Sequence, residues 1–120
     1  MDKLLDSNIE AMDGFRYVFE GSGYWYKIFL HKVKSTSARP HGVKYELTLH
    51  DDKNKRVMGF DNAHGNYRGY KKGDPYDHWH RASLDGGELV KRYNYKNSSK
   101  LIEDFFREVD SIDDEVEGGL

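Results

Sequence analysis

The alternation of apolar and polar side chains along the chain predicts a series of β-strands. Residues 15–20 and 24–33 are rich in aromatic and β-branched side chains, and Gly21-Ser22-Gly23 separates them, which is typical of a β-hairpin. Residues 43–49 alternate at every position, as a strand with one buried face does. Three further segments of strand-like composition, each bounded by turn residues, are 56–60, 76–82 and 89–95. The pattern predicts a mainly antiparallel β-sheet of about five or six strands.

A different period governs the C-terminal part, where apolar residues recur at the spacing of one helix face. Either Asn97 or Ser98 can cap the N-terminus of this helix. The apolar positions are Leu101, Ile102, Phe105, Phe106, Val109, Ile112 and Val116. An amphipathic helix is therefore expected over residues 98–117. A run of strands followed by one such helix predicts an α+β fold, with the helix packed on the sheet.

The length of 120 residues suits a single domain spanning residues 1–120. Its first residues, 1–13, form a brief segment rich in Asp and Asn, and they are expected to be loosely ordered. Residues 62–75 contain several Gly and Lys and no core-forming run, so they are expected to form a long basic loop.

The composition excludes several classes of site and of location. The chain contains no cysteine, which excludes disulfides, thiol nucleophiles and the common cysteine-containing zinc and iron–sulfur sites. No apolar stretch approaches the roughly 20 residues of a membrane span, and the start lacks the pattern of a signal peptide. No phosphate-binding glycine loop, G-x-S-x-G or H-E-x-x-H motif occurs. We expect a cytoplasmic protein that needs no cofactor and does not associate with membranes.

The net charge of −2 conceals a strong segregation of charge along the chain. Residues 27–100 contain sixteen Lys and Arg against eight Asp and Glu, and they hold all six His. Residues 101–120 contain one Arg against eight acids. A basic body beside an acidic helix favours a polyanionic partner such as nucleic acid. Because position in the sequence is not position in space, an evenly solvated charged surface is the alternative.

The densest cluster of titratable side chains surrounds a pair of histidines. In an extended strand, His78 and His80 point to one face, about 7 Å apart along the strand, whereas Asp77 and Arg81 point to the other. A metal-free ribonuclease needs two such imidazoles. One removes the proton of a 2′-hydroxyl, and the other protonates the leaving 5′-oxygen.

Two other uses of these histidines stay open. His78 and His80 could converge on a metal ion, with His64 or Asp61 as a third ligand. They could also be polar side chains on a solvated face of the sheet. Asp61 and Asn62 directly follow a strand, where they either take part in the site or build a turn.

Aromatic and basic side chains interleave in the predicted loop. The segment Tyr67-Arg68-Gly69-Tyr70-Lys71-Lys72 combines cations that neutralise phosphates with rings on which bases stack. Tyr67, Arg68, Tyr70, Lys71 and Lys72 are therefore candidate nucleic-acid contacts. An ordinary solvated loop is the alternative.

Four ordered segments, at residues 39–51, 59–64, 76–81 and 101–110, carry a family resemblance. The second begins Gly59-Phe60-Asp61-Asn62, and the third contains Asp77-His78-Trp79-His80. Together they resemble the TumE family of small bacterial and archaeal proteins. Four motifs in matching order are far more specific than any one of them.

This resemblance implies the toxin component of a type II toxin–antitoxin module, neutralised by direct binding of a helix-turn-helix antitoxin. With the histidine pair and the basic body, the leading hypothesis is a small endoribonuclease that cleaves RNA without a metal and stops translation. The histidines would transfer protons, the acids or the amide would orient an imidazole or the phosphate, and the arginine would stabilise charge. These candidates are His78, His80, Asp77, Asp61, Asn62 and Arg81. A metal-dependent nuclease or hydrolase, a non-catalytic protein- or RNA-binding module, and self-association of the chain stay open.

Overall fold

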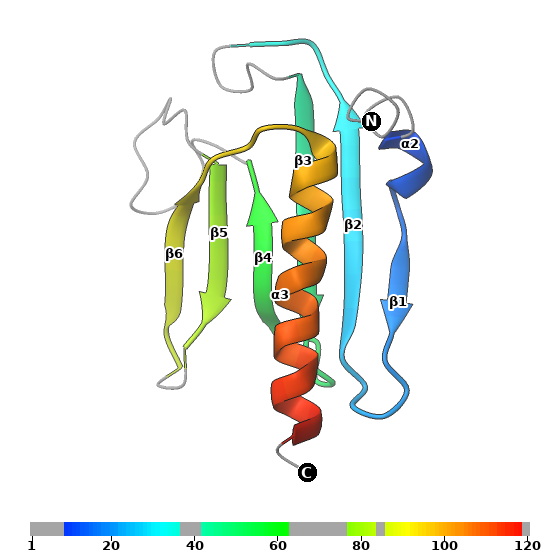
Figure 1. The fold of residues 1–120 in the computed structure, drawn as a ribbon, viewed down its shortest axis with the longest axis vertical. Coiled ribbons are helices and arrows are strands. Elements are labelled where there is room, and N and C mark those ends of the chain that lie inside the picture. The colour runs from blue at the N-terminus through cyan, green and yellow to red at the C-terminus, as the bar shows by residue number, and fades with distance from the viewer. Residues whose placement is uncertain (1–8, 37–41, 63–76, 84–85, 119–120) are drawn as a thin grey trace.

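The chain forms one antiparallel sheet with a long helix against one of its faces (Figure 1). The computed structural model describes residues 9–36, 42–62, 77–83 and 86–118. In chain order the elements are α2 (Ile9–Met12), β1 (Arg16–Val18), β2 (Trp25–Lys32), β3 (Val43–His50), β4 (Arg56–Asp61), β5 (Asp77–Ala82), β6 (Glu88–Tyr93) and α3 (Ser98–Gly118). The predicted α+β fold, with about five or six strands and a C-terminal helix, is confirmed.

The sheet is a simple meander. Its six strands lie in the order β1-β2-β3-β4-β5-β6, and each pairs antiparallel with its neighbour in sequence. The β1–β2 turn includes Gly23, whose positive φ of 77° favours glycine. A Cβ there would also lie 3.0 Å from the Cβ of Asp52, so the turn requires both the conformation and the space.

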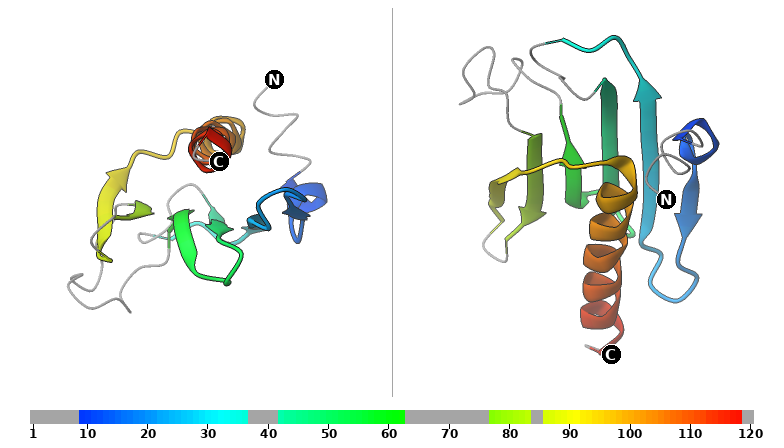
Figure 2. Two further views of the ribbon diagram at one scale, coloured as in Figure 1. Left: turned by 90° about the horizontal axis from the view of Figure 1, so that it is seen from below. Right: turned by 45° about the horizontal axis from the view of Figure 1, so that its top comes forward.

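The core lies between the sheet and α3. Alternate residues of β3, namely Val43, Tyr45, Leu47 and Leu49, are buried and share their face with Phe60 of β4. The helix contributes Leu101, Phe105, Val109 and Ile112. The views in Figure 2 show α3 lying over one face of the sheet. The alternation in β3 and the helical spacing after residue 100 thus produce the two apolar surfaces that meet.

Helix α3 begins as its sequence predicts. The backbone N–H of Lys100 donates to Oδ1 of Asn97 at 2.7 Å, so Asn97 is the N-cap. Further along, the ring of Phe105 meets Tyr26 of β2 and Phe60 of β4 edge-on, with centroid distances of 5.7 and 6.3 Å. The cap and these rings fix α3 across the middle of the sheet.

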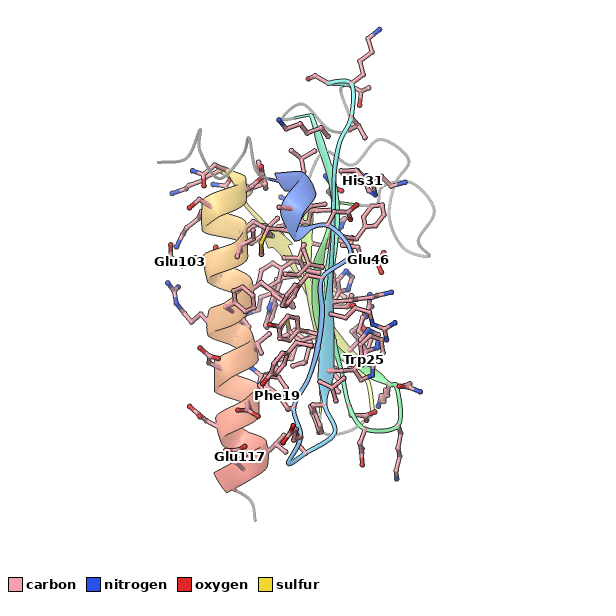
Figure 3. All side chains as sticks on the ribbon, turned by 90° about the vertical axis from the view of Figure 1, so that its right-hand side faces the viewer. Phe19, Trp25, His31, Glu46, Glu103 and Glu117 are labelled. Atoms are coloured by element: carbon pink, nitrogen blue, oxygen red, sulfur yellow. The ribbon has the colours of Figure 1, made fainter. Side chains whose placement is uncertain are left out.

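The opposite side of the sheet, which we call the distal face, is polar. Strand register places Lys27, Thr48, Gly59 and His80 in one cross-strand row, and Phe29, Glu46, Asp61 and His78 in the next. Trp25, His31 and Glu46 project from the sheet away from α3, whereas Phe19 lies on the side of the helix (Figure 3). The histidine pair therefore belongs to the distal face.

Some sequence predictions lie outside the described residues. Only Ile9–Met12 of the segment expected to be loosely ordered is seen as an element, and residues 1–8 are not described. Of the expected loop over 62–75, only Asn62 is described. None of the described helices combines the length and apolar character that a membrane span requires.

Candidate active site

A chain of charged side chains runs across the distal face from β4 to β6. Nε2 of His80 lies 2.8 Å from Oδ2 of Asp61, and Nδ1 of the same ring lies 3.0 Å from Oε1 of Glu88. Arg56 in turn donates to the other oxygen of Glu88 at 3.0 Å. Each nitrogen of the His80 ring therefore faces a carboxylate, an arrangement that suits the doubly protonated imidazolium.

His78 completes this cluster from the neighbouring position on its face. Its ring centroid lies 6.1 Å from that of His80, and its Nδ1 lies 3.8 Å from Oδ1 of Asp61. The side chains of His78 and Asp61 are each only 2% exposed. Register explains the meeting, because Asp61 pairs directly with His78 across β4 and β5. One buried carboxylate thus lies between two imidazoles, and we call Asp61, His78 and His80 the histidine–aspartate cluster.

The surroundings of His80 favour its charged form. Burial lowers the pKa of this imidazole, but the hydrogen bond and charge of Asp61, followed by the hydrogen bond of Glu88, outweigh burial and the nearby Arg56. The net effect raises the pKa of His80 above 6.5, the ordinary value for histidine. His80 therefore carries a proton at a pH where an unperturbed histidine has lost it.

This raised pKa predicts a pH dependence of stability. Because folded His80 binds its proton more tightly than unfolded His80, the free energy of unfolding falls as pH rises above 6.5 through the folded pKa. The slope from one such proton is at most about 1.4 kcal/mol per pH unit. In His80→Gln this contribution is expected to vanish, which urea denaturation from pH 5 to pH 9 would measure. His50 is present in both wild type and variant, so its contribution to the pH dependence cancels in the comparison. Parallel curves of the free energy of unfolding against pH for the two proteins would contradict the prediction.

A family model described as Toxin TumE matches residues 6–113, which include all six strands and most of α3. The chain belongs to the TumE toxin family. No curated protein and no solved structure matches the chain significantly. Membership of a toxin family implies an antitoxin as partner of this TumE toxin.

Two of the sequence candidates are not brought to the cluster of this TumE toxin. Asp77 and Arg81 lie on the face toward α3, because alternate residues of β5 point to opposite sides. Tyr45 donates its hydroxyl proton to Asp77, and burial together with the Asp77 charge raises the pKa of Tyr45. Arg81 donates to Glu115 of α3 at 3.1 Å. In this geometry the side chain of Asp77 binds Tyr45 of β3 and that of Arg81 binds α3, both on the side of the sheet opposite the histidine pair.

Asn62 supports the cluster through the backbone. Its side-chain oxygen accepts from the N–H of Tyr45 at 3.0 Å, and its amide donates to the carbonyl of Val43. These bonds continue the pairing of β4 with β3 after β4 has ended at Asp61. Asn62 thereby fixes the position of Asp61, as a residue of a tight connection does.

Two residues of the site do not stand out in the sequence. Glu88 and Arg56 complete the charged chain at His80, yet neither belongs to a motif of the TumE toxin resemblance. The register of the β5–β6 hairpin is the feature that could have indicated Glu88. Ala82 pairs with Glu88, which brings the glutamate onto the face of His80. A hairpin alignment across Gly86-Gly87 could have suggested Glu88.

Other sequence candidates cannot be placed. His64 and the interleaved residues Tyr67, Arg68, Tyr70, Lys71 and Lys72 lie outside the described residues. Within residues 9–36, 42–62, 77–83 and 86–118, no group of three or more His, Asp or Glu side chains is arranged to hold a metal ion. The metal-binding alternative, with His64 as third ligand, therefore stays a question for experiment.

Proposed function

We propose that this TumE toxin is a small cytoplasmic endoribonuclease that works without a metal, with His78 as general base and His80 as general acid. The observation that carries the proposal is the histidine–aspartate cluster, in which Asp61 lies 2.8 Å from one imidazole and 3.8 Å from the other. A buried carboxylate beside two imidazoles is an arrangement that suits transfer of protons to and from a substrate. Here Asp61 positions both rings.

The reaction is transfer of the phosphoryl group within RNA. His78 takes the proton of a 2′-hydroxyl, the 2′-oxygen forms a bond to phosphorus, and the bond from phosphorus to the 5′-oxygen breaks. His80 gives its proton to that leaving oxygen. The products are a 2′,3′-cyclic phosphate and a 5′-hydroxyl, and the two histidines have exchanged protonation states.

Glu88 and Arg56 have subsidiary roles in this proposal. The Glu88 side chain is 39% exposed, so it can swing away and free Nδ1 of His80 to donate its proton. Arg56, released from Glu88, then supplies a positive charge for the developing phosphorane. Arg56 takes the role that the sequence hypothesis gave to Arg81, since Arg81 contacts α3.

The partners follow from the same proposal. RNA is the substrate, and a helix-turn-helix antitoxin neutralises the toxin by direct binding. Self-association of the chain is a separate property that size-exclusion chromatography of the purified protein measures directly.

The decisive test combines colony survival with RNA cleavage. Induced wild-type chain should kill bacteria, and the purified protein should cleave RNA equally well with and without a chelator. The double variant His78→Ala/His80→Ala should do neither while retaining a wild-type circular dichroism spectrum. His31→Ala is the matched control, because His31 is a partly exposed histidine on the same face, paired with Asp13 at 3.1 Å. It should kill as wild type does.

Each contrary result has a definite meaning. Loss of cleavage in chelator would replace this proposal by a metal-dependent nuclease. Killing by both wild type and the folded double variant would indicate toxicity through binding alone. Intact RNA in the presence of folded wild type would remove the ribonuclease assignment.

A further inference from the structure

A second feature of the distal face is a pocket of about 380 Å³ beside the histidine–aspartate cluster. Its polar lining comes from three neighbouring strands and from the end of a fourth, and comprises Arg16, Lys27, Lys44, Glu46 and Asn62. Phe29 supplies an aromatic wall. The volume lies within the roughly 300–1,000 Å³ of small-ligand sites. The pocket can therefore hold a group of about the size of one nucleotide.

The lining of this pocket is predominantly positive. Three cations, Arg16, Lys27 and Lys44, face one carboxylate, that of Glu46. Across the described part of the chain, none of the three cations forms an ion pair. Their charges are thus not neutralised by a neighbouring acid at contact distance. Cations left in this way attract anionic groups of a ligand.

Nearby groups support a positive potential across this part of the face. His50 lies in the row next to Lys27, on β3. Burial lowers the pKa of His50, and the charges of Lys27 and Arg56 lower it further, against the raising effects of the Asn54 carbonyl and Glu46. The same cations that disfavour a charged imidazole favour a phosphate.

Aromatic rings hold one of the cations in place. The guanidinium of Arg16 lies 4.5 Å from the centroid of the Trp25 ring, and Trp25 stacks on His50 at 4.1 Å with an interplanar angle of 8°. Phe29 is 36% exposed, so its ring is accessible at the pocket. A fixed arginine beside an accessible ring is the combination that contacts a phosphate and a base together.

The pocket lies next to the histidine–aspartate cluster on the sheet. Glu46, in its lining, pairs directly with Asp61 across β3 and β4, and Asn62 follows Asp61 in the chain. Neighbouring β-strands lie about 4.8 Å apart, which is less than the length of one nucleotide. One RNA chain lying across β2, β3 and β4 can therefore reach both the pocket and the cluster.

We infer that the pocket is a subsite for single-stranded RNA, in which Lys27 and Lys44 bind a phosphate and Phe29 stacks on a base flanking the scissile bond. This inference rests on the proposed function, because it names how the substrate of the same site is held. Single-stranded RNA is favoured over a duplex, since a base can reach an aromatic wall only when it is unpaired.

The test measures binding separately from cleavage. The probe is a short, fluorescently labelled 2′-O-methyl RNA, which has no free 2′-hydroxyl and cannot be cleaved by the proposed reaction. For Lys27→Gln/Lys44→Gln, we expect the Kd at low salt to rise about tenfold or more. The slope of log K against log salt should be shallower by about 0.7, the value for one lost phosphate contact with a single strand.

The matched control removes two lysines from another part of the chain. Lys53 and Lys55 lie exposed in the β3–β4 turn and do not line the pocket. Lys53→Gln/Lys55→Gln makes the same change in net charge and should bind almost as wild type does. Equal weakening in both variants, an unchanged Kd in the pocket variant, or absence of wild-type binding would overturn the subsite.

Failure of the subsite and failure of the ribonuclease proposal are distinguishable. Wild type that binds the probe through Lys27 and Lys44 but leaves ordinary RNA intact supports the subsite and removes the ribonuclease. Wild type that cleaves RNA, with a pocket variant that binds normally, overturns the subsite and leaves the ribonuclease standing.

Discussion

Asp61→Asn is expected to lower the free energy of unfolding by about 3–5 kcal/mol at pH 5, where the partner His80 is protonated. The substitution keeps the size of the side chain but removes the negative charge that lies 2.8 Å from His80 in a buried setting. At pH 8 the loss should be smaller, because the imidazole can then release its proton instead of remaining charged. Urea denaturation at the two pH values measures both changes.

Glu88→Gln is the matched control for this substitution. Glu88 contacts the same imidazole through the other ring nitrogen, but its side chain is 39% exposed whereas that of Asp61 is 2% exposed. Since exposed ion pairs contribute little, the control should cost about 1 kcal/mol or less. If the two variants lost similar amounts of free energy of unfolding, the burial of Asp61 would not explain its contribution to stability. Asp61→Asn should also abolish killing, because it removes the group that orients both histidines.

Phe105→Ala should have a comparably large effect on stability, about 3–5 kcal/mol. Phe105 is 0% exposed and its ring contacts Tyr26 and Phe60, so the substitution leaves a cavity between α3 and two strands. A domain of this size has only about 5–15 kcal/mol of stability in total. We therefore expect a much lower urea midpoint, with part of the protein unfolded in the absence of denaturant.

Phe15→Ala supplies the comparison for the same chemical change at the surface. Phe15 is 45% exposed and lies before β1. Its loss should cost about 1 kcal/mol or less, because much of the ring is already in contact with water. If Phe105→Ala cost no more than Phe15→Ala, the packing of α3 against the sheet would be contradicted.

The elements of the fold could be predicted because their signals are local. The strict alternation around Tyr45 determines which side of β3 is buried, and the spacing of Leu101, Phe105 and Val109 determines one face of α3. Asn97 could be named as one of two candidate caps for the same reason, since capping depends on adjacent residues. Short turns join β1 to β2, β3 to β4 and β5 to β6, and such connections favour pairing between strands that are neighbours in sequence.

The site could be predicted only in part. The shared face of His78 and His80 follows from alternation, but what surrounds them depends on contacts between strands. Glu88 reaches His80 because of the β5–β6 register. Asp77 binds Tyr45 because alternate residues of β5 point to opposite faces, and the side chain of Asp77 points to the face that carries the helix. Sequence motifs place residues close together along the chain, whereas these contacts join residues that are distant along it.

The meander has a consequence for the way the protein is made. Each strand pairs with the strand synthesised just before it, so the sheet can form progressively from β1 to β6 as the chain emerges from the ribosome. The helix that covers its apolar side is synthesised after all six strands. During that interval Tyr26, Leu47 and Phe60 have no helix against them. Translation therefore produces the face that carries the histidines before it produces the element that seals the core.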